Sequence, residues 1–206
     1  MKQVQQHWEN IFSHKSDEQK SWYQSYPSTS VKLIEELNLS RAAAIIDVGG
    51  GDSKLVDVLL EKRYTNLSVL DISETAILNV KKRLGNEATK VKWIISDILE
   101  YKPERQFELW HDRAAFHFLT TDEQIRKYVH LTEANILTGG YLILGTFSEK
   151  GPLKCSGLDV MRYSRQSMAP RFADQFENIK CIEESHETPS KTIQHFLFCV
   201  FRKTKS

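Results

Sequence analysis

Ile45-Ile46-Asp47-Val48-Gly49-Gly50-Gly51-Asp52-Ser53 joins an apolar run to three successive glycines and then to a helical pattern over residues 53–63. Glycines at such a turn adopt backbone conformations that other residues avoid, and they let the chain approach a ligand closely. The first turn of the following helix offers unpaired N–H groups. The stretch therefore predicts a strand, a turn and a helix that bind a nucleotide-like ligand. The alternative is that the glycines serve only a tight turn.

Apolar runs alternate with helical patterns along the chain beyond this turn. Strands are predicted at residues 44–48, 67–72, 91–95, 107–111 and 140–147, and helices at 53–63, 73–84 and 121–137. Ser73 is a typical N-cap, with Glu74 in the first turn of its helix. Strands separated by helices pair in parallel through right-handed crossovers. The expected fold class is therefore α/β, a doubly wound, mostly parallel sheet with helices on both faces.

The end of the chain departs from this alternation. A helix is predicted at residues 164–176, and two strand-like runs follow at 179–184 and 192–201. The turn-rich residues 186–190 between them leave no room for a helix, so these runs predict an antiparallel hairpin.

Two helices are predicted before the first strand, at residues 3–12 and 28–39. We expect them to cap the carboxyl edge of the sheet, where ligands bind in open α/β folds. The chain is expected to form a single domain over residues 1–206, with residues 1–40 as a helical cap or lid and residues 41–206 as the core.

Composition narrows the class of protein. The 206 residues include 28 Lys+Arg and 27 Asp+Glu, a formal net charge of +1, so no overall positive field favours a nucleic-acid partner. Residues 1–10 lack the apolar core of a signal peptide, and no run approaches the roughly 18 apolar residues of a membrane span. We expect a cytoplasmic protein without a membrane or nucleic-acid partner, and the sequence leaves its oligomeric state open.

The three cysteines, Cys155, Cys181 and Cys199, form no C-x-x-C pair and lack the histidine spacing of a zinc site, so no metal is expected. Cys181 and Cys199 are expected to be buried strand residues. Cys155 lies in the Gly/Pro-punctuated stretch 151–158, where binding residues are common, although a simple loop side chain is the alternative.

Acidic residues mark the ends of three consecutive predicted strands. Asp47 precedes the glycines, Asp71 ends the second strand and Asp97 follows the third. The dinucleotide-binding motif requires a glycine where Lys54 stands, and Asp47 would repel a pyrophosphate. A carboxylate about 20 residues beyond the glycines, the position of Asp71, accepts hydrogen bonds from ribose hydroxyls in nucleotide-binding folds.

Two isoleucines follow these aspartates directly. Ile72 and Ile98 are expected to place apolar surface on the two faces of an adenine ring. Three strands that end in Asp, with glycines at the first, favour adenosine with a positive rather than a negative tail. Helix or turn caps are the alternative explanation of Asp71 and Asp97.

With these residues the sequence resembles the class I S-adenosylmethionine-dependent methyltransferases, which have a Rossmann-like, seven-stranded fold. The family's first motif, acidic-x-Gly-x-Gly-x-Gly, matches Asp47-x-Gly49-x-Gly51-x-Ser53, with a serine in place of the last glycine. The family's ribose-binding and adenine-binding acidic residues match Asp71 and Asp97. The resemblance covers roughly residue 42 to the C-terminus, including the final antiparallel hairpin.

The resemblance implies S-adenosyl-L-methionine as the cofactor. Asp71 would hold the ribose hydroxyls, Asp97 the adenine amino group, and Gly49, Gly50 and Gly51 the methionine end. Asp47 would orient that turn or the ammonium group of the cofactor. Asp112 and Arg113 fall in the segment after the fourth strand, which in this family borders the methionine moiety and the substrate.

The remaining candidates concern the substrate and the chemistry. Trp22 and Tyr23 either form a lid or pack the N-terminal helices, and Arg113 and Arg162 either present cations to an acidic substrate or are solvated. His117 and Arg113 are the candidates for a catalytic role, although His117, between two phenylalanines, is also typical of a half-buried packing residue.

The implied activity is transfer of a methyl group to an N, O or S nucleophile by in-line displacement. Such a reaction needs alignment and exclusion of water, and a general base only for a protonated acceptor. A small-molecule acceptor is favoured. The alternatives are a protein lysine methyltransferase, an NAD(P)-dependent oxidoreductase, which Lys54 and the lack of a Tyr-x-x-x-Lys pair disfavour, and a cofactor-binding protein without transferase activity.

Overall fold

The computed structural model describes residues 2–205, whose contacts divide into two compact units. The first unit runs to Lys102 and includes Thr188–Lys191. The second comprises Pro103–Glu187 and the residues from Thr192 onward. The single-domain organisation stays a prediction.

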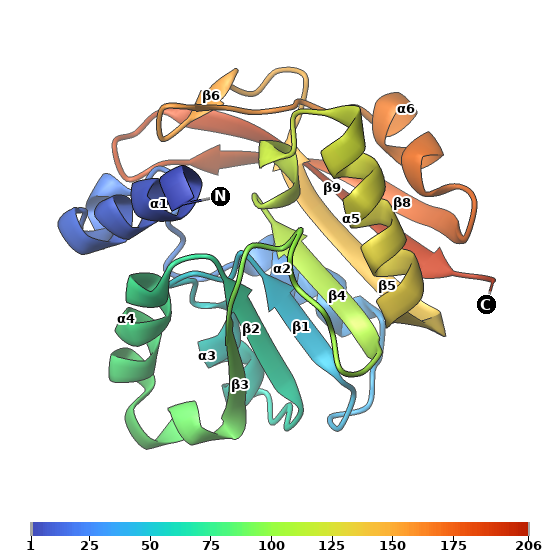
Figure 1. The fold of residues 1–206 in the computed structure, drawn as a ribbon, viewed down its shortest axis with the longest axis horizontal. Coiled ribbons are helices and arrows are strands. Elements are labelled where there is room, and N and C mark those ends of the chain that lie inside the picture. Colours follow the sequence, from blue (N-terminus) through green and yellow to red (C-terminus); the bar gives the residue numbers. More distant parts are fainter. Residues whose placement is uncertain (1, 206) are drawn as a thin grey trace. The chain divides into compact units, whose positions relative to one another are not determined.

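The first unit contains three parallel strands and four helices (Figure 1). The strands β1 (Ile45–Val48), β2 (Leu67–Asp71) and β3 (Val91–Ile95) pair in the order β3-β2-β1, with Asp47 in register with Val69 and Asp71 with Ile95. The helices are α1 (Lys2–His14), α2 (Ser28–Glu36), α3 (Leu55–Glu61) and α4 (Glu74–Leu84), with short 3₁₀ turns η1 (Asp17–Gln19) and η2 (Gly85–Lys90).

Helical and strand periodicity account for the core of this unit. All four residues of β1 are buried, and α3 buries Leu55, Val56 and Leu59, as their spacing predicts. Ser73 is the N-cap of α4, since its hydroxyl accepts a hydrogen bond from the Ala76 N–H at 3.1 Å. The predicted strand, turn and helix around the glycines are therefore confirmed.

The second unit contains four strands in the order β4-β5-β9-β8. Strands β4 (Phe107–Arg113) and β5 (Ile136–Phe147) are parallel, whereas β9 (Ile193–Lys203) pairs antiparallel with both β5 and β8 (Phe176–Glu187). The other elements are η3 (Phe116–Phe118), α5 (Asp122–Asn135), the small hairpin β6 (Lys154–Cys155) and β7 (Leu158–Asp159), α6 (Arg165–Met168) and η4 (Ala169–Phe172).

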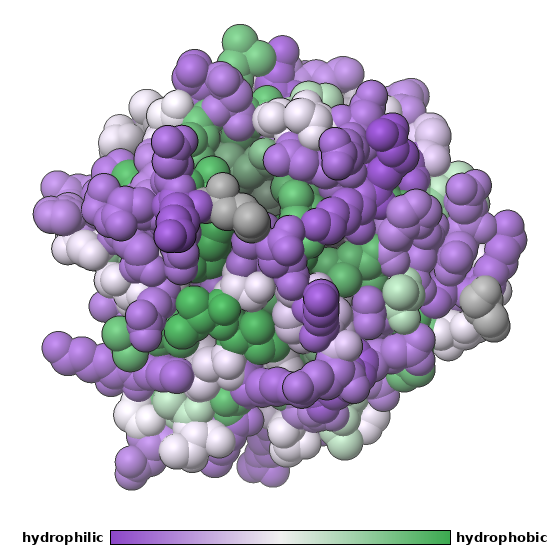
Figure 2. Space-filling model, viewed as in Figure 1, coloured by the Kyte–Doolittle hydropathy of each residue, from purple (hydrophilic) through white to green (hydrophobic). Residues whose placement is uncertain are grey.

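These seven strands confirm the predicted fold class, a mixed, mostly parallel sheet that ends in an antiparallel hairpin and is surrounded by helices. The face in Figure 2 is covered mainly by hydrophilic side chains. Among residues 2–205, no helix is long and apolar enough to cross a membrane. Within the same residues, no group of three or more His, Cys, Asp or Glu side chains is placed to hold a metal ion.

Several predicted boundaries are wrong. The helix expected at 164–176 ends at Met168 and continues only as η4, because Pro170 lacks a backbone N–H and disfavours helical backbone in the residue before it. The helix expected at 121–137 ends at Asn135, and β5 begins four residues before the predicted 140. The helix expected at 28–39 ends at Glu36, followed by Asn38 at a φ of 49°.

Cys181 and Cys199 form a disulfide, which the sequence did not predict. The register of β8 and β9 places the two residues directly opposite each other. Cys199 is buried, as expected, whereas Cys181 is partly exposed. Disulfides are rare in reducing compartments, so the cytoplasmic location stays a prediction.

Candidate functional site

The glycine turn after β1 has a backbone that other residues cannot easily adopt. Gly49 and Gly51 have φ of 64° and 47°, and a Cβ on Gly50 would lie 2.7 Å from Val69 Cγ1 and 2.9 Å from the Asp47 carboxylate. Ser53, which replaces the motif's last glycine, accepts a hydrogen bond at 3.1 Å from the N–H of Leu55, the first residue of α3. The turn thus presents backbone rather than side chains.

Asp71 lies beside this turn, at the carboxyl end of β2. Its carboxylate accepts hydrogen bonds from the N–H of Ser73 at 2.8 Å and from the N–H of Gly51. Burial raises the pKa of Asp71 to about 7, against these two bonds, and the negative charges of Asp52 and Asp47 act in the same direction as burial. The fold therefore brings the glycine turn and this carboxylate together, as the strand ends predict.

Asp97 follows β3 in a turn joined to the end of β2, because Ser96 N–H donates to the Asp71 carbonyl at 2.9 Å. The Asp97 carboxylate accepts from Leu99 N–H at 2.9 Å. Asp71 and Asp97 thus each accept a hydrogen bond from the N–H two residues later, which is the turn-capping role that the sequence offered as the alternative to ligand binding. A carboxylate accepts about four hydrogen bonds, so capping leaves capacity for a ligand. Ile72 and Ile98, beside them, are half-buried.

Helix α1 lies over the carboxyl end of β2 and over the glycine turn (Figure 1). The Glu9 carboxylate accepts hydrogen bonds from Ser73 Oγ at 2.9 Å and from the N–H groups of Glu74 and Thr75 at 2.7 and 3.1 Å. Burial raises the pKa of Glu9, but these bonds outweigh it and lower the pKa overall. A Cβ on Gly51 would lie 3.1 Å from the Phe12 ring.

The second N-terminal helix has different neighbours. Helix α2 packs against α3, where Lys62 Nζ and a Glu35 carboxylate oxygen are 2.6 Å apart. The apolar side of α2, with Val31, Leu33 and Ile34, is buried. The expectation that residues 28–39 cap the carboxyl edge stays a prediction.

A buried lysine fixes the segment after α1 to the glycine turn. Lys20 is 2% exposed, and its ammonium donates to the carboxylates of Asp52 and of Asp17, the latter at 3.0 Å. Burial lowers the pKa of Lys20, but the two carboxylates outweigh burial and raise it. The ammonium also lies 5.5 Å from the centre of the Phe12 ring.

Aromatic side chains complete this region of the first unit. Trp22 makes edge contacts with Trp8 and Phe12, at ring distances of 5.8 and 6.1 Å. The structure gives Trp22 a packing role, and Tyr23 next to it is half-buried.

Arg83 of α4 braces the glycine turn from the other side. It donates to the carbonyls of Asp52 and Ser53 at 2.9 and 2.6 Å, and it pairs with both carboxylate oxygens of Asp57. Neither Arg83 nor Glu9 nor Lys20 was a sequence candidate, because isolated charges in polar segments carry no recognisable pattern.

In the second unit, Asp112 organises the loop after β4. It is fully buried, and one carboxylate oxygen accepts from the N–H groups of Ala115 and Phe116 at 2.9 and 3.0 Å, while the other accepts from Tyr128 Oη–H at 2.7 Å. Burial raises the pKa of Asp112 to about 6. These contacts give its carboxylate an internal role and lend no support to the predicted contact with a cofactor.

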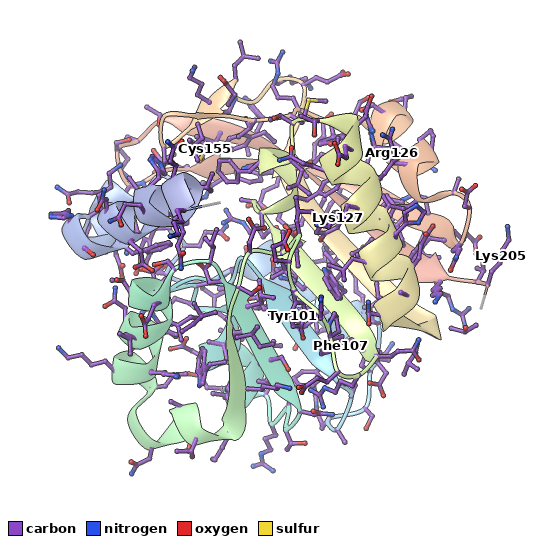
Figure 3. The ribbon with its side chains drawn as sticks, viewed as in Figure 1. Tyr101, Phe107, Arg126, Lys127, Cys155 and Lys205 are labelled. Atoms are coloured by element: carbon purple, nitrogen blue, oxygen red, sulfur yellow. A yellow bond between two sulfur atoms is a disulfide. The ribbon has the colours of Figure 1, made fainter. Side chains whose placement is uncertain are left out.

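The other candidates of this unit lie at the end of β4 and in the segment after β5. Arg113 places its guanidinium 4.8 Å from the centre of the Phe196 ring. Arg162 is exposed, and it donates to the carbonyls of Glu149 and Gly151 at 2.7 and 3.3 Å. Cys155, labelled in Figure 3, is buried on β6 and takes no part in the disulfide.

His117 is buried against Phe147, whose N–H donates to His117 Nδ1 at 3.3 Å. Burial, together with the positive charge of Arg113, lowers the pKa of His117 to about 3. A histidine whose nitrogen lone pair is occupied and whose charged form is so disfavoured is a poor general base. The geometry therefore counts against that role.

Comparison with known proteins agrees with the fold and the motif. Residues 45–140 match the family described as a methyltransferase domain. The chain is 27% identical over 135 residues to malonyl-[acyl-carrier protein] O-methyltransferase 1 of Ilyobacter polytropus. The matched region covers 62% of this chain and 48% of the relative. The chain thus spans about half the length of that relative.

Two solved structures are similar over most of this chain. The N-methyltransferase NodS of Bradyrhizobium japonicum, in complex with S-adenosylhomocysteine, has a TM-score of 0.71 at 16% identity and covers 95% of this chain and 97% of its own. The 1,6-didemethyltoxoflavin-N1-methyltransferase of Burkholderia thailandensis, with bound 1,6-didemethyltoxoflavin and S-adenosylhomocysteine, has a TM-score of 0.69 at 17% identity. The match covers 98% of this chain and 85% of that one. At these identities the likeness shows the fold.

Proposed function

We propose that this chain, a member of the class I S-adenosylmethionine-dependent methyltransferases, transfers a methyl group to an N, O or S nucleophile of a small molecule. One observation carries the proposal. The glycine turn and the buried Asp71 carboxylate lie side by side at the carboxyl ends of β1 and β2, joined by the Gly51 N–H.

The residues at this edge suit an adenosyl cofactor with a positive tail. Asp71 is proposed to accept hydrogen bonds from the ribose hydroxyls and Asp97 from the adenine amino group, with Ile72 and Ile98 against the ring. Gly49–Gly51 and Asp47 are proposed to hold the methionine end. A Cβ on Gly50 would meet Val69 at 2.7 Å, so only a glycine leaves the turn as open backbone.

When bound, this cofactor supplies a methyl group already activated by a positive sulfur. The protein then has to align the two reactants and exclude water. Phe12, Trp8 and Trp22 provide apolar surface next to the glycine turn. Lys20 pairs with Asp52 and so reduces the net negative charge at this edge.

A small molecule is the favoured acceptor. The two similar solved structures are named as N-methyltransferases, and one holds bound 1,6-didemethyltoxoflavin. The nearly balanced charge of this chain, +1 overall, gives no support to a nucleic-acid substrate. Arg113 and Arg162 remain the proposed substrate-facing cations, with Tyr23 as an aromatic neighbour.

Labelled S-adenosylmethionine tests the proposal when it is supplied with five separate acceptor sets: small carboxylates, small thiols, small amines, a protein lysate and RNA. Label is expected in the small molecules. Label confined to RNA or to protein would defeat the small-molecule assignment. Thermal stabilisation by NADH or NADPH and not by S-adenosylhomocysteine would defeat the cofactor assignment.

A further inference from the structure

The disulfide of the second unit joins an edge strand to a buried strand. Cys181 lies on β8, the last strand in the order β4-β5-β9-β8, and is half-buried, whereas Cys199 lies on β9 and is fully buried (Figure 1). Of the two residues, only Cys181 has surface that a thiol in solution can reach. Exposed disulfides are the ones that thiols reduce most readily.

A β-bulge brings the two cysteines opposite each other. The register between β8 and β9 shifts by one residue between Asn178 and Lys180, and Cys181 consequently faces Cys199. In the register before the shift, Cys181 would face Phe198, and its side chain would lie on the other face of the sheet from that of Cys199. The disulfide therefore depends on this bulge, a feature that is common next to functional sites.

An amide side chain at the bulge contacts the half-buried cysteine. Asn178 Nδ2–H donates to the Val200 carbonyl of β9 at 3.3 Å and to Cys181 Sγ at 3.4 Å. After reduction, the same donor stabilises the Cys181 thiolate, because hydrogen bonds to a charged acceptor are stronger than those to a neutral one. The thiolate is the form of cysteine that reacts with disulfides and oxidants. Asn178 thus favours Cys181 as the reactive thiol, with Cys199 as its partner.

The part of β8 beyond the disulfide is weakly anchored. Of residues 182–187, only His186 is buried, and its ring lies 6.1 Å from that of Phe196 on β9. Phe196 in turn contacts the ring of Phe147 and the guanidinium of Arg113, each at 4.8 Å. Segments with few buried side chains open locally at low cost in free energy. The covalent link to β9 therefore keeps this segment ordered beside Phe196.

We propose that Cys181 and Cys199 form a reversible redox site. Oxidation holds residues 182–187 on β9, and reduction by a dithiol releases them. The site goes beyond the proposed function and involves no cofactor.

Reduction proceeds by two thiol–disulfide exchanges. One thiolate of the dithiol attacks Cys181 Sγ, and Cys199 Sγ leaves with the electron pair of the S–S bond and takes a proton from water. The second thiolate of the dithiol then attacks the sulfur of the first, which releases the Cys181 thiolate. Two electrons pass to the protein, and the reductant leaves as a cyclic disulfide.

Dithiothreitol tests whether this disulfide opens in the folded protein. Air-oxidised protein is treated with millimolar dithiothreitol without denaturant, and the free thiols are labelled with a maleimide and located by peptide mass spectrometry. Cys181 should become labelled, at least tenfold faster than Cys199 and the buried Cys155. A disulfide that resists dithiothreitol until urea unfolds the protein would overturn the proposal, as would two free thiols at these positions after oxidation.

Hydrogen exchange measures what the link controls. Reduction of wild type should speed exchange of the amides of residues 182–187 at least tenfold and leave those of residues 141–147 in β5 unchanged. The double variant Cys181→Ser/Cys199→Ser should match reduced wild type, and Cys155→Ser should match wild type in both redox states. Equal exchange of residues 182–187 in oxidised and reduced wild type would overturn the proposal without the need for any variant to fold.

Asn178→Asp tests the role of the amide donor. The substitution keeps the shape of the side chain but replaces the N–H group by a negatively charged oxygen, which disfavours a neighbouring thiolate. In the reduced protein at neutral pH, alkylation of Cys181 should slow at least threefold. Glu177→Gln, at the exposed position before it, is the control and should slow nothing. Equal rates in wild type and Asn178→Asp would refute the assignment of Cys181 as the reactive thiol.

Discussion

Replacing Lys20 by Met is expected to destabilise the protein by about 3 kcal/mol. The side chains of Lys20 and Asp52 are only 3% and 9% exposed, so the substitution leaves a nearly buried carboxylate without its cation. Removing one partner of a buried pair typically costs about 3–5 kcal/mol. The lower end applies here because the residual exposure of Asp52 lets water reach its carboxylate. The loss should free the segment after α1 from the glycine turn.

Urea unfolding followed by tryptophan fluorescence measures this loss, since Trp8 and Trp22 lie in the same region. Lys62→Met is the matched control. Its pair with Glu35 is 28% and 46% exposed, and exposed ion pairs contribute little to stability, so this substitution should cost much less. The double variant Lys20→Met/Asp52→Asn should recover part of the loss, because the unpaired charge is gone. Equal losses in Lys20→Met and Lys62→Met would refute the reasoning.

Three further predictions concern the two units. Gly51→Ala should lose about 2–4 kcal/mol in urea unfolding and bind S-adenosylhomocysteine at least tenfold more weakly, because its φ is 47° and its Cβ would lie 3.1 Å from Phe12. Gly85→Ala, also at a strained backbone (φ 56°, ψ −126°) but with its Cβ in open space, should bind S-adenosylhomocysteine as wild type does, and equal affinities of the two variants would contradict this. The pKa of Asp71 is raised from 3.8 to about 7, so the stability that this carboxyl group contributes is present at low pH and is lost as the pH rises from about 4 through 7. Over that range the melting temperature of wild type should fall relative to that of Asp71→Asn. A constant difference between the two melting temperatures would contradict this prediction. Tyr128→Phe should lose about 1.5–3 kcal/mol in urea unfolding by removing the donor to buried Asp112, and a loss below about 0.5 kcal/mol would show that this bond contributes little.

The part of the site that could be predicted depends on local patterns. The apolar run before Gly49–Gly51 identifies a buried strand, and the ends of parallel strands share one edge of a sheet. Those two rules were enough to bring Asp71 next to the glycine turn. The terminal hairpin was equally predictable, because residues 186–190 permit a turn and leave no room for a helix.

The residues that hold the turn in place could not be predicted. Glu9 and its partner Ser73 are 64 positions apart, Lys20 and Asp52 are 32 apart, and Arg83 and Ser53 are 30 apart. No local periodicity links such pairs, and only the packing of α1 and α4 on the strands brings them together.

The role of His117 also needed three-dimensional geometry. From the sequence, a histidine between two phenylalanines is more often a packing residue than a base. The donor at Phe147, 30 positions away, identifies the protonated nitrogen, and no pattern around residue 117 contains that information.

Calorimetric titration with S-adenosylhomocysteine tests most directly the claim that the glycine turn and Asp71 form an adenosyl cofactor site. Wild type should bind one molecule per chain, and Asp71→Ala should remain folded but bind at least tenfold more weakly, a loss of about 1.4 kcal/mol or more. NADH, titrated in parallel, should give no binding heat. Equal affinity in wild type and in folded Asp71→Ala, or binding of NADH but not of S-adenosylhomocysteine, would contradict the account.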